Sequence, residues 1–435
     1  MATATDISLI ERLRPHGVAM WRRITSRRRR GPGGKRDDSP TTPIRRRPNV
    51  DFSLTGLVYC TMMLFMGLAA INSQANLLFG VFGLMIGILL VSAMICRRVL
   101  TRLKVRRVIP EYAAVGQPAT IQYGFFNAKR IFPTLSVCLA ELDGAEAFTQ
   151  QPHVYLLHVA AGKSATVPIT VTPKRRGSHT LTSFQISTSF PFGFVKRALT
   201  GRCDDAIMIY PAIGVVSPRL LAMCQSAERG GANMKPRRNG SDEFYGVKEF
   251  RQGDNPRWIC WKRSARTGEL VSREMVQISP PKLLILLDSF IETPTPAEHE
   301  TVERAIAMAA SLASRAMDSG MAVGLCAWAG KWITIAPQRG KRHCRDILAA
   351  LSGLPVNRTA PVQQLVEHGQ GLLGEGVTPV LIASRASQPT LAQRARGAMV
   401  VVSVNSEQAR SWFQFDPIVD FSRCMPAEQM KAMVR

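Results

Sequence analysis

Two groups of residues in this sequence have types and spacing that could support chemistry. The first is Asp288-Ser289, which directly follows the apolar run KLLILL at 282–287. If that run is a buried strand of a parallel sheet, the carboxylate and hydroxyl lie at its carboxyl end, where ligands of such sheets bind. The second is EFRQGDNPRWICWKRSARTGEL at 249–270, in which five cations surround two tryptophans. Arginine and tryptophan together can hold phosphates and stack on bases.

The residues that follow the first run resemble a metal site that has lost its ligands. In the von Willebrand factor A fold, which this pattern resembles, an Asp-x-Ser-x-Ser loop binds a divalent metal through one carboxylate and two hydroxyls. A hard cation needs several oxygen ligands at once. Here Phe290 and Glu292 occupy the two serine positions, and Ser384 replaces the usual Asp at a later strand end. We therefore expect no metal and no cofactor at Asp288 and Ser289, and we expect Asp288 to cap nearby backbone amides.

The remaining sequence contains no recognisable catalytic pattern. Its seven histidines are dispersed, and it has no Gly-x-Ser-x-Gly, His-Glu-x-x-His or dinucleotide glycine fingerprint. A Gly-Lys-Ser at 162–164 lacks the first glycine of a P-loop, because Leu157 stands there, and we expect a hairpin turn instead. The nine cysteines form no CxxC pair, which argues against a disulfide framework or a zinc module. We expect a protein that is not an enzyme; the alternative is an enzyme with an unrecognised site near Asp288.

Two soluble folds are predicted to position these residues. Between 103 and 211, the runs ATIQYGFFN, ATVPITVTP and HTLTSFQISTSF have a period near two and are separated by turn signals. They predict a small antiparallel β-sandwich. Between 280 and 405, four apolar strands (KLLILLDSF, MAVGLCAWA, VTPVLIAS and AMVVVSV) alternate with helical segments. This alternation predicts a mostly parallel sheet with helices on both faces, a Rossmann-like α/β domain that resembles the von Willebrand factor A fold.

Helix boundaries can also be predicted within the α/β region. Thr295 as N-cap, Pro296 in the first turn and Glu298 three residues after the cap predict a helix start, and Gly320 predicts its end. The runs CRDILAALSGL and LAQRARG predict two further helices. Residues 406–435 are expected to form a C-terminal tail.

A membrane segment precedes these folds. Residues 52–96 carry no formal charge and hold two apolar blocks, 53–71 and 77–95, joined by the polar run NSQAN. Each block is close to the ~20 residues that a helix needs to cross a bilayer. We predict a transmembrane helical hairpin, because a helix pairs its backbone groups internally in lipid. A cleaved signal peptide fits less well, since the first block starts beyond residue 50 and a second block follows. The other alternative is a buried helical hairpin of a soluble protein.

The net charge of +25 is concentrated near this segment. Residues 1–110 contain 19 Lys/Arg and 5 Asp/Glu, whereas residues 111–435 contain 37 and 26. Basic clusters flank both ends of the hairpin and the turn has none, so the positive-inside rule places both termini and the soluble domains in the cytoplasm. We expect a two-pass protein of the bacterial inner (plasma) membrane, in which residues 1–51 form a disordered basic tail that can also bind anionic lipid headgroups.

The block 235–275 resembles the signature of the bacterial domain-of-unknown-function family numbered 58. That signature has an acidic–aromatic start, Arg-x-x-Gly-Asp, Arg, Trp-Lys and a Ser/Thr-Ala-Arg-x-Gly-x-Leu ending. The matching residues are Phe244, Arg251, Gly253, Asp254, Arg257, Trp261, Lys262, Ala265, Arg266, Gly268 and Leu270. Cys260 departs from the pattern, because members usually carry a polar residue before the Trp. The run SFPFGF at 189–194 is similar to the Pro-Phe-Gly motif that closes the family's β domain.

This resemblance implies a membrane-anchored cytoplasmic protein whose last domain is related to von Willebrand factor A. Such proteins are commonly encoded beside MoxR-type AAA ATPases and transglutaminase-like proteins. We therefore expect a scaffold or adaptor that works with a MoxR-type AAA ATPase and other envelope-associated proteins in the assembly or maturation of envelope complexes.

The signature block has two further interpretations. It could bind nucleic acid through its arginines and tryptophans, although its interleaved acids and the mildly basic soluble portion argue against this. Alternatively, Arg251, Asp254, Arg257 and Arg266 could form an internal salt-bridge network that locks the β domain to the α/β domain. In that structural interpretation Trp261 belongs to the core.

Overall fold

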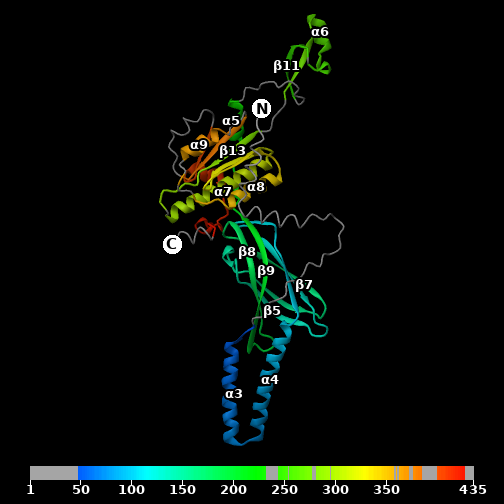
Figure 1. The fold of residues 1–435 in the computed structure, drawn as a ribbon, viewed down its shortest axis with the longest axis vertical. Coiled ribbons are helices and arrows are strands. Elements are labelled where there is room, and N and C mark those ends of the chain that lie inside the picture. Colours follow the sequence, from blue (N-terminus) through cyan, green and yellow to red (C-terminus); the bar gives the residue numbers. More distant parts are fainter. Residues whose placement is uncertain are drawn as a thin grey trace. The chain divides into compact units, whose positions relative to one another are not determined.

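The computed structural model describes residues 48–231, 243–252, 254–276, 281–293, 295–356, 359, 362–371, 376–384 and 399–426. They belong to two compact units, whose elements are labelled in Figure 1. The first unit comprises Met1–Tyr112, Pro118–Thr172 and Ser178–Met208, and the second comprises Ala113–Gln117, Pro173–Gly177 and Ile209–Arg435. Two short segments of the second unit thus lie within the sequence of the first.

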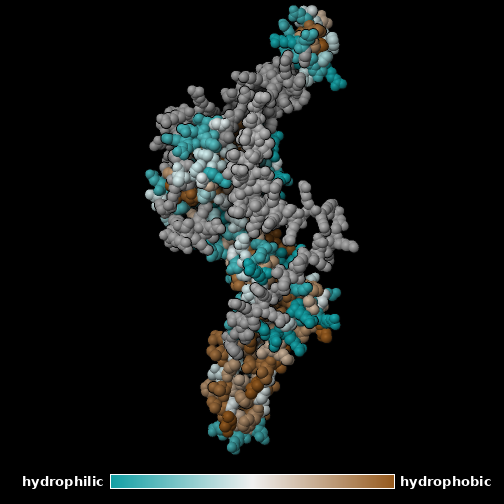
Figure 2. Space-filling view, in the orientation of Figure 1, coloured by the Kyte–Doolittle hydropathy of each residue, from teal (hydrophilic) through white to brown (hydrophobic). Residues whose placement is uncertain are grey.

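Two long helices of the first unit pack against each other. Helices α3, Leu54–Ser73, and α4, Asn76–Leu100, are each long and apolar enough to cross a membrane, by length and composition alone. Hydrophobic surface covers both of them in Figure 2. They cover the predicted blocks 53–71 and 77–95, but α4 continues to Leu100 and carries Arg97 and Arg98 in its last turn. Cations at that end suit the helix dipole.

A short strand precedes the first helix. Strand β1, Pro48–Phe52, pairs antiparallel with β9, Val195–Tyr210. Residues 48–51 were predicted to be part of the disordered tail, so this strand corrects the prediction there. The reason is tertiary, because the partner strand lies almost 150 residues further along the chain. The rest of the predicted tail, 1–47, lies outside the described residues.

Strands in the predicted β region form two sheets. One has the order β2-β4-β7, with bounds Leu103–Val108, Ala119–Asn127 and Ser164–Val171. The other has the order β1-β9-β8-β5-β6, with β3, Tyr112–Ala114, also paired to β9. Its strands β5, β6 and β8 span Thr134–Glu141, His153–Val159 and Gly177–Thr188, and η1, Ala145–Ala147, follows β5. Alternate residues of β4 are buried, as its sequence period of two predicts.

The Gly-Lys-Ser at 162–164 lies in a turn that joins the two sheets. Strand β6 pairs with β5 and strand β7 pairs with β4, so the predicted hairpin between β6 and β7 is wrong. Gly162 has a φ of 72°, which favours glycine, and Lys163 N donates to Ala160 O at 3.2 Å. The turn chemistry was predictable, but the strand partners were not, because β7 pairs with β4 and not with the strand that precedes it.

A buried arginine lies inside the first unit. Arg107 Nη1 donates to Glu141 Oε2 at 2.6 Å, and Nε donates to Asp205 Oδ2 at 3.0 Å. Its Nη2 donates to the carbonyl oxygens of Leu181 and Cys203, each at 2.6 Å. Tyr123 Oη donates to the other oxygen of Glu141 at 2.7 Å. Burial, together with the Glu141 carboxylate, raises the pKa of Tyr123, so its phenol stays protonated and remains a donor.

The second unit contains a five-stranded sheet with the order β15-β14-β13-β16-β17. Strands β14 and β16 run parallel to the central β13, β17 runs parallel to β16, and β15 is antiparallel to β14. The bounds from β13 to β17 are Lys282–Leu287, Ala322–Trp328, Trp332–Gln338, Val377–Ala383 and Val400–Ser403. Both faces of β13 are buried, in agreement with its continuous apolar sequence.

Helices account for the burial of this sheet. Helix α9, Val362–Gln370, packs Leu365 and Val366 against Leu284 and Leu286 of β13. Gly369 makes this approach possible, because a Cβ there would meet Leu286 Cδ2 at 2.6 Å. Helix α7, Pro296–Asp318, packs against β13, β14 and β16 and also against α8, Lys341–Ser352. A further helix, α5, spans Pro218–Gly231.

The predicted strands and caps of this region are largely observed. Thr295 Oγ1 accepts from Glu298 N at 3.3 Å, and Pro296 is the first residue of α7. The Glu298 carboxylate accepts from Thr293 N rather than from the N-cap amide, so the capping box is only half formed. Strand β15 and helix α9 were not predicted. The predicted helix LAQRARG at 391–397 lies outside the described residues.

A second buried arginine holds elements of the second unit together. Arg176 Nε and Nη2 donate to the two oxygens of Glu303 on α7, each at 2.8 Å. Its Nη1 donates to Leu351 O and Ser352 O at 3.0 Å, at the end of α8. The Arg176 backbone N donates to Cys424 O at 2.9 Å. One side chain and its backbone therefore join α7, α8 and the end of the described chain.

The predicted C-terminal tail is part of the second unit. Beyond residue 405, α11, Glu407–Trp412, is followed by β18, Phe413–Gln414, which pairs with β10, Val215–Val216. The 3-10 helix η3, Phe421–Arg423, packs against α7. Phe413, Cys424 and Met425 are buried. The tail prediction is therefore wrong for 406–426, because polar residues between these apolar anchors weakened the hydrophobic pattern.

We expect Glu303→Gln to lower the free energy of unfolding of the second unit by about 3–5 kcal/mol, since it leaves a buried guanidinium without its carboxylate. The matched control is Glu300→Gln on the same helix, which removes the exposed Glu300–Arg304 pair and should cost less than about 1 kcal/mol. Urea unfolding of the full-length protein in detergent, followed by tryptophan fluorescence, reports on this unit because five of the six tryptophans follow Ile209. Equal losses in the two variants would contradict the role of Arg176.

Candidate functional site

The signature block folds as a hairpin with an elaborated loop. Strands β11, Glu243–Glu249, and β12, Val271–Val276, pair antiparallel, with Glu249 opposite Val271. Between them lie the 3-10 helix η2, Pro256–Trp258, and helix α6, Trp261–Thr267. The residue types of WICW are typical of a short strand and those of SARTGEL of a turn, whereas in the structure α6 begins at the last residue of WICW and continues into SARTGEL. The helix forms because Lys, Arg and Ala favour it and Gly268, with φ of 78°, ends it by donating to Ser264 O.

Asp254 organises the loop of this hairpin. Its Oδ1 accepts from Lys248 Nζ at 3.1 Å, and its Oδ2 accepts from Arg251 N at 3.1 Å. The Asp254 side chain is only 7% exposed. Asn255 Oδ1 accepts from Arg257 N at 3.1 Å and thereby caps η2. The acid of the Gly-Asp pair thus has a structural role, while Gly253 lies outside the described residues.

Cys260 and Ser264 join α6 to β12. Cys260 N donates to Val271 O at 2.8 Å, and Val271 N donates to Ser264 Oγ at 2.9 Å. Ser264 Oγ in turn donates to Cys260 O at 3.1 Å. Cys260 Sγ accepts from Arg273 Nε at 3.3 Å. The thiol therefore supplies an acceptor at the position where the sequence departs from the family signature.

The remaining signature side chains of the loop face solvent. Trp261 is 67% exposed, which contradicts the core position that the structural interpretation gives it. Arg251, Arg257, Lys262 and Arg266 are also exposed, whereas Asp254 pairs with Lys248. Lys262 and Arg266 are four residues apart in α6 and so share one face. For Phe244 the structure describes the backbone, which pairs with Met275.

Two of the three cations of α6 oppose the dipole of the helix, whereas Arg266 in its last turn suits it. Its first turn contains Lys262 and Arg263 and no acidic residue. Cations near a helix N-terminus oppose the dipole, whereas anions would stabilise it. These cations and the indole of Trp261 are all exposed on α6, and we refer to Trp261, Lys262, Arg263 and Arg266 together as the basic–aromatic face. Such a face can bind an anionic or acidic partner.

The Asp288 strand end is a second candidate. Asp288 is 2% exposed and follows β13, and its N donates to Ile382 O at 2.9 Å. Its Oδ1 accepts from Phe290 N at 3.0 Å, and Ser384 Oγ lies 3.3 Å from Oδ2. The carboxylate thus caps a loop amide, as the sequence suggested. Within the described ranges, no group of three or more His, Cys, Asp and Glu residues could hold a metal ion, and Ser289 Oγ is buried without a hydrogen-bond partner.

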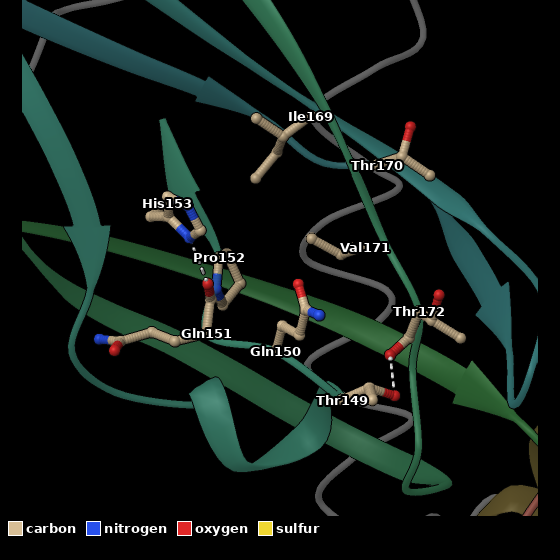
Figure 3. A pocket seen from close by; sticks show the side chains of 9 residues that line it. All are labelled: Thr149, Gln150, Gln151, Pro152, His153, Ile169, Thr170, Val171 and Thr172. Carbon is tan, nitrogen blue, oxygen red and sulfur yellow. Dashed lines mark hydrogen bonds between the residues drawn. The ribbon is translucent and has the colours of Figure 1, made fainter. Parts of the chain in front are cut away.

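A polar pocket of about 210 Å³ lies in the first unit (Figure 3). It lies between the segment that leads into β6 and the end of β7, and hydroxyl and amide side chains make up most of its lining. His153 Nδ1 lies 3.1 Å from Gln151 O, and Thr149 Oγ1 donates to Thr172 O at 3.1 Å. None of the residues singled out from the sequence lines this pocket. Its lining contains no Asp, Glu, Lys or Arg.

Comparison with known proteins supports the resemblance of the signature block. The sequence model of the family described as "Protein of unknown function DUF58" matches residues 246–372, from β11 to the end of α9. Over 211 residues the chain is 23% identical to the uncharacterized protein YeaD of Bacillus subtilis (strain 168). The matched region covers 48% of this chain and 50% of that protein. The chain thus spans about half the length of the curated relative that it matches.

Two solved structures are similar only in part. The sporulation control protein Spo0M from Bacillus subtilis is 10% identical, covers 30% of this chain and 56% of its own, and has a TM-score of 0.16. The superoxide reductase (neelaredoxin) from Ignicoccus hospitalis is 12% identical, covers 24% and 79%, and has a TM-score of 0.15. With TM-scores this low, neither structure bears on the fold or on the site.

Two buried serines at the Asp288 strand end give a matched test. Ser384→Ala removes a hydroxyl that lies 3.3 Å from Asp288 Oδ2 and 3.1 Å from Phe290 O, and it should lower the free energy of unfolding by about 0.5–1.5 kcal/mol, the net worth of one hydrogen bond. Ser289→Ala removes an unpartnered hydroxyl and should leave stability unchanged or raise it. Tryptophan-detected urea unfolding of the full-length protein, with and without Mg²⁺, measures both. A Mg²⁺-dependent stabilisation that Ser289→Ala abolishes would show instead that this hydroxyl is a metal ligand.

Proposed function

We propose that this protein is a membrane-anchored adaptor that uses the basic–aromatic face of its signature hairpin to bind a protein partner. The observation that carries the proposal is the exposed indole of Trp261 among cations, on a hairpin whose loop is already held by its own hydrogen bonds. A tryptophan left in solvent by its own fold is available to an interface. Tryptophan and arginine are also the residues most enriched at the energetic centres of protein interfaces.

The anchor is the hairpin of α3 and α4. Both helices have membrane-spanning length and hydropathy. Arg97 and Arg98 lie in the last turn of α4 and Arg102 follows it, a basic cluster at 45–47 precedes α3, and the connecting turn carries no cation. By the positive-inside rule, this distribution favours a two-pass protein of a bacterial inner membrane, with both termini and the soluble domains in the cytoplasm.

The partner that we propose is a MoxR-type AAA ATPase, within the assembly or maturation of envelope complexes. The support is the family resemblance. Its signature includes every residue of the basic–aromatic face except Arg263. A face with three cations and one indole is complementary to a surface that combines carboxylates with an apolar pocket. Complementary charge of this kind speeds association and excludes wrong partners.

We also propose that the sheet of the second unit is von Willebrand factor A-like. Its first strand, β13, lies in the middle of the sheet, and the parallel strands extend from it in both directions. Asp288 stands at the carboxyl end of that strand, where such folds bind their ligands. In this chain its carboxylate accepts from a loop amide, so the domain is proposed to act as a protein-binding scaffold without a metal.

Nucleic acid is the second candidate, because an exposed tryptophan beside arginines can also stack on bases. Glu249 and Glu269 lie in the same hairpin and are exposed, and their charges repel phosphates. Binding of single-stranded nucleic acid that weakens steeply with salt would favour this candidate over the adaptor.

We expect Trp261→Ala and Arg266→Ala each to leave the protein folded and to reduce its copurification with the MoxR-type ATPase from detergent-solubilised membranes. The physical reason is that both side chains are exposed, so their truncation removes partner contacts and little internal packing. Arg339→Ala, an exposed arginine outside the signature, is the matched control and should copurify as the wild type does. Retained copurification in both hairpin variants would contradict docking through this face, and unfolding of either variant would show that its side chain stabilises the fold.

A further inference from the structure

Two loops of the first unit are fixed at the end of the helical hairpin where α3 begins and α4 ends. The first is 189–194, the SFPFGF run between β8 and β9. Ser53 N donates to Phe194 O at 3.2 Å, and Thr55 Oγ1 donates to Gly193 O at 3.1 Å. The rings of Tyr59 and Phe194 stack with their centroids 4.1 Å apart. The loop therefore lies against the first two turns of α3.

A glycine permits this close approach. A Cβ at Gly56 would lie 2.1 Å from Phe194 O, a distance that no real side chain could keep. Cys96 Sγ, one turn before the end of α4, lies 3.4 Å from Thr188 O and 3.6 Å from Val195 O, on either side of the same loop. The loop is thus held by both helices at once.

The second loop is 128–133, between β4 and β5. Lys129 is buried, and its Nζ donates to Val99 O at 2.8 Å and to Arg98 O at 3.1 Å. These carbonyls belong to the last turn of α4, where a cation is favoured by the helix dipole. Burial lowers the pKa of Lys129 to about 8, so the ammonium is still mostly charged at neutral pH. The loop is therefore fixed to the end of α4.

Each of these loops presents an apolar side chain to solvent. Ile131 is 91% exposed and Phe192 is 54% exposed. A single exposed apolar residue is ordinary on a soluble surface. Here the two residues belong to loops that are bonded to the same end of two helices with membrane-spanning character. If those helices cross a membrane, Ile131 and Phe192 lie beside lipid and not in bulk water.

The charged residues of these two loops and of the α4 end are all cations. Arg97, Arg98, Arg102 and Lys104 are exposed at and after the end of α4, and Arg130 is exposed beside Ile131. The segments 97–107, 128–133 and 189–194 contain no Asp or Glu. Apolar side chains with surrounding cations are the composition of surfaces that lie in a membrane interface and contact anionic headgroups.

We propose that loops 128–133 and 189–194 insert Ile131 and Phe192 into the interfacial region of an anionic phospholipid membrane, with Arg97, Arg98, Arg102 and Arg130 binding the headgroups. This inference rests on the proposed membrane anchoring by α3 and α4. It adds that the β strands of the first unit are attached to the membrane surface by their own loops. The partner is phospholipid and not a protein, because the surface continues directly from the lipid-facing helices.

The test places a photo-crosslinking residue, p-benzoylphenylalanine, at Ile131 or at Phe192 of the full-length chain in phosphatidylcholine vesicles with and without phosphatidylglycerol. We expect lipid adducts at both positions by mass spectrometry, with a higher yield when phosphatidylglycerol is present. Leu142 is the matched control, because it is exposed and follows the far end of the eight-residue strand β5, roughly 25 Å away at ~3.3 Å per residue. It should give no lipid adduct.

A third position separates this inference from the anchoring itself. Leu64, exposed in the middle of α3, should give lipid adducts if the hairpin crosses the membrane. Adducts at Leu64 without adducts at Ile131 and Phe192 would overturn the inference and leave the anchoring intact. The absence of adducts at Leu64 would overturn both.

The role of the charges is tested in the same experiment. Arg102→Gln with Arg130→Gln should reduce the Ile131 adduct several-fold in vesicles that contain phosphatidylglycerol, because each cation at an anionic surface contributes to binding. Arg202→Gln, at a highly exposed arginine of the same unit, should leave the yield unchanged. Equal yields in the wild type and the double variant would overturn headgroup binding by these arginines.

Discussion

A buried guanidinium needs acceptors for most of its five N–H donors, and each unit contains a buried arginine that has four. Arg107 binds Glu141, Asp205 and two carbonyls in the first unit. Arg176 binds Glu303 and two carbonyls at the end of α8 in the second. Both side chains are 1% exposed. Because an unpaired charge in such a place is very costly, these pairings constrain which elements can come together.

The other arginines described above have the opposite environment. Those of α6 and of the α4 end are exposed, where they contribute little to stability and remain available to partners. Arginine therefore has two roles in this chain. Buried arginines hold elements together within each unit, and exposed arginines form basic surfaces. The hairpin face is suited to an acidic protein, and the surface beside α4 is suited to anionic lipid. The adaptor function and the lipid contact proposed above would each use one of these surfaces.

Local patterns predicted the elements with strong periodicity or caps, and failed where distant contacts decide. The alternation in ATIQYGFFN matches β4, and Thr295-Pro296 marks the start of α7. Strand β15 was missed because Pro337 lies within it, which an antiparallel edge tolerates. Helix α6 has seven residues, too few to show a helical period. The signature residues were found from the sequence, but their exposure was not. Asp254 and Arg266 are both charged residues, and the sequence does not show that the first is nearly buried and the second exposed. The partners of Arg176 are also 127 residues or more away.

The two short segments of the second unit that lie within the first have a consequence for biosynthesis. The chain passes from one unit to the other after residues 112, 117, 172, 177 and 208. During translation Arg176 leaves the ribosome well before Glu303, and Cys424, its backbone partner, comes later still. These contacts of the second unit can therefore form only after Cys424 has been made, and contacts between residues so distant in sequence are expected to form slowly. A chain that started at residue 209 would lack Arg176, and Glu303 would be left buried without its counter-charge.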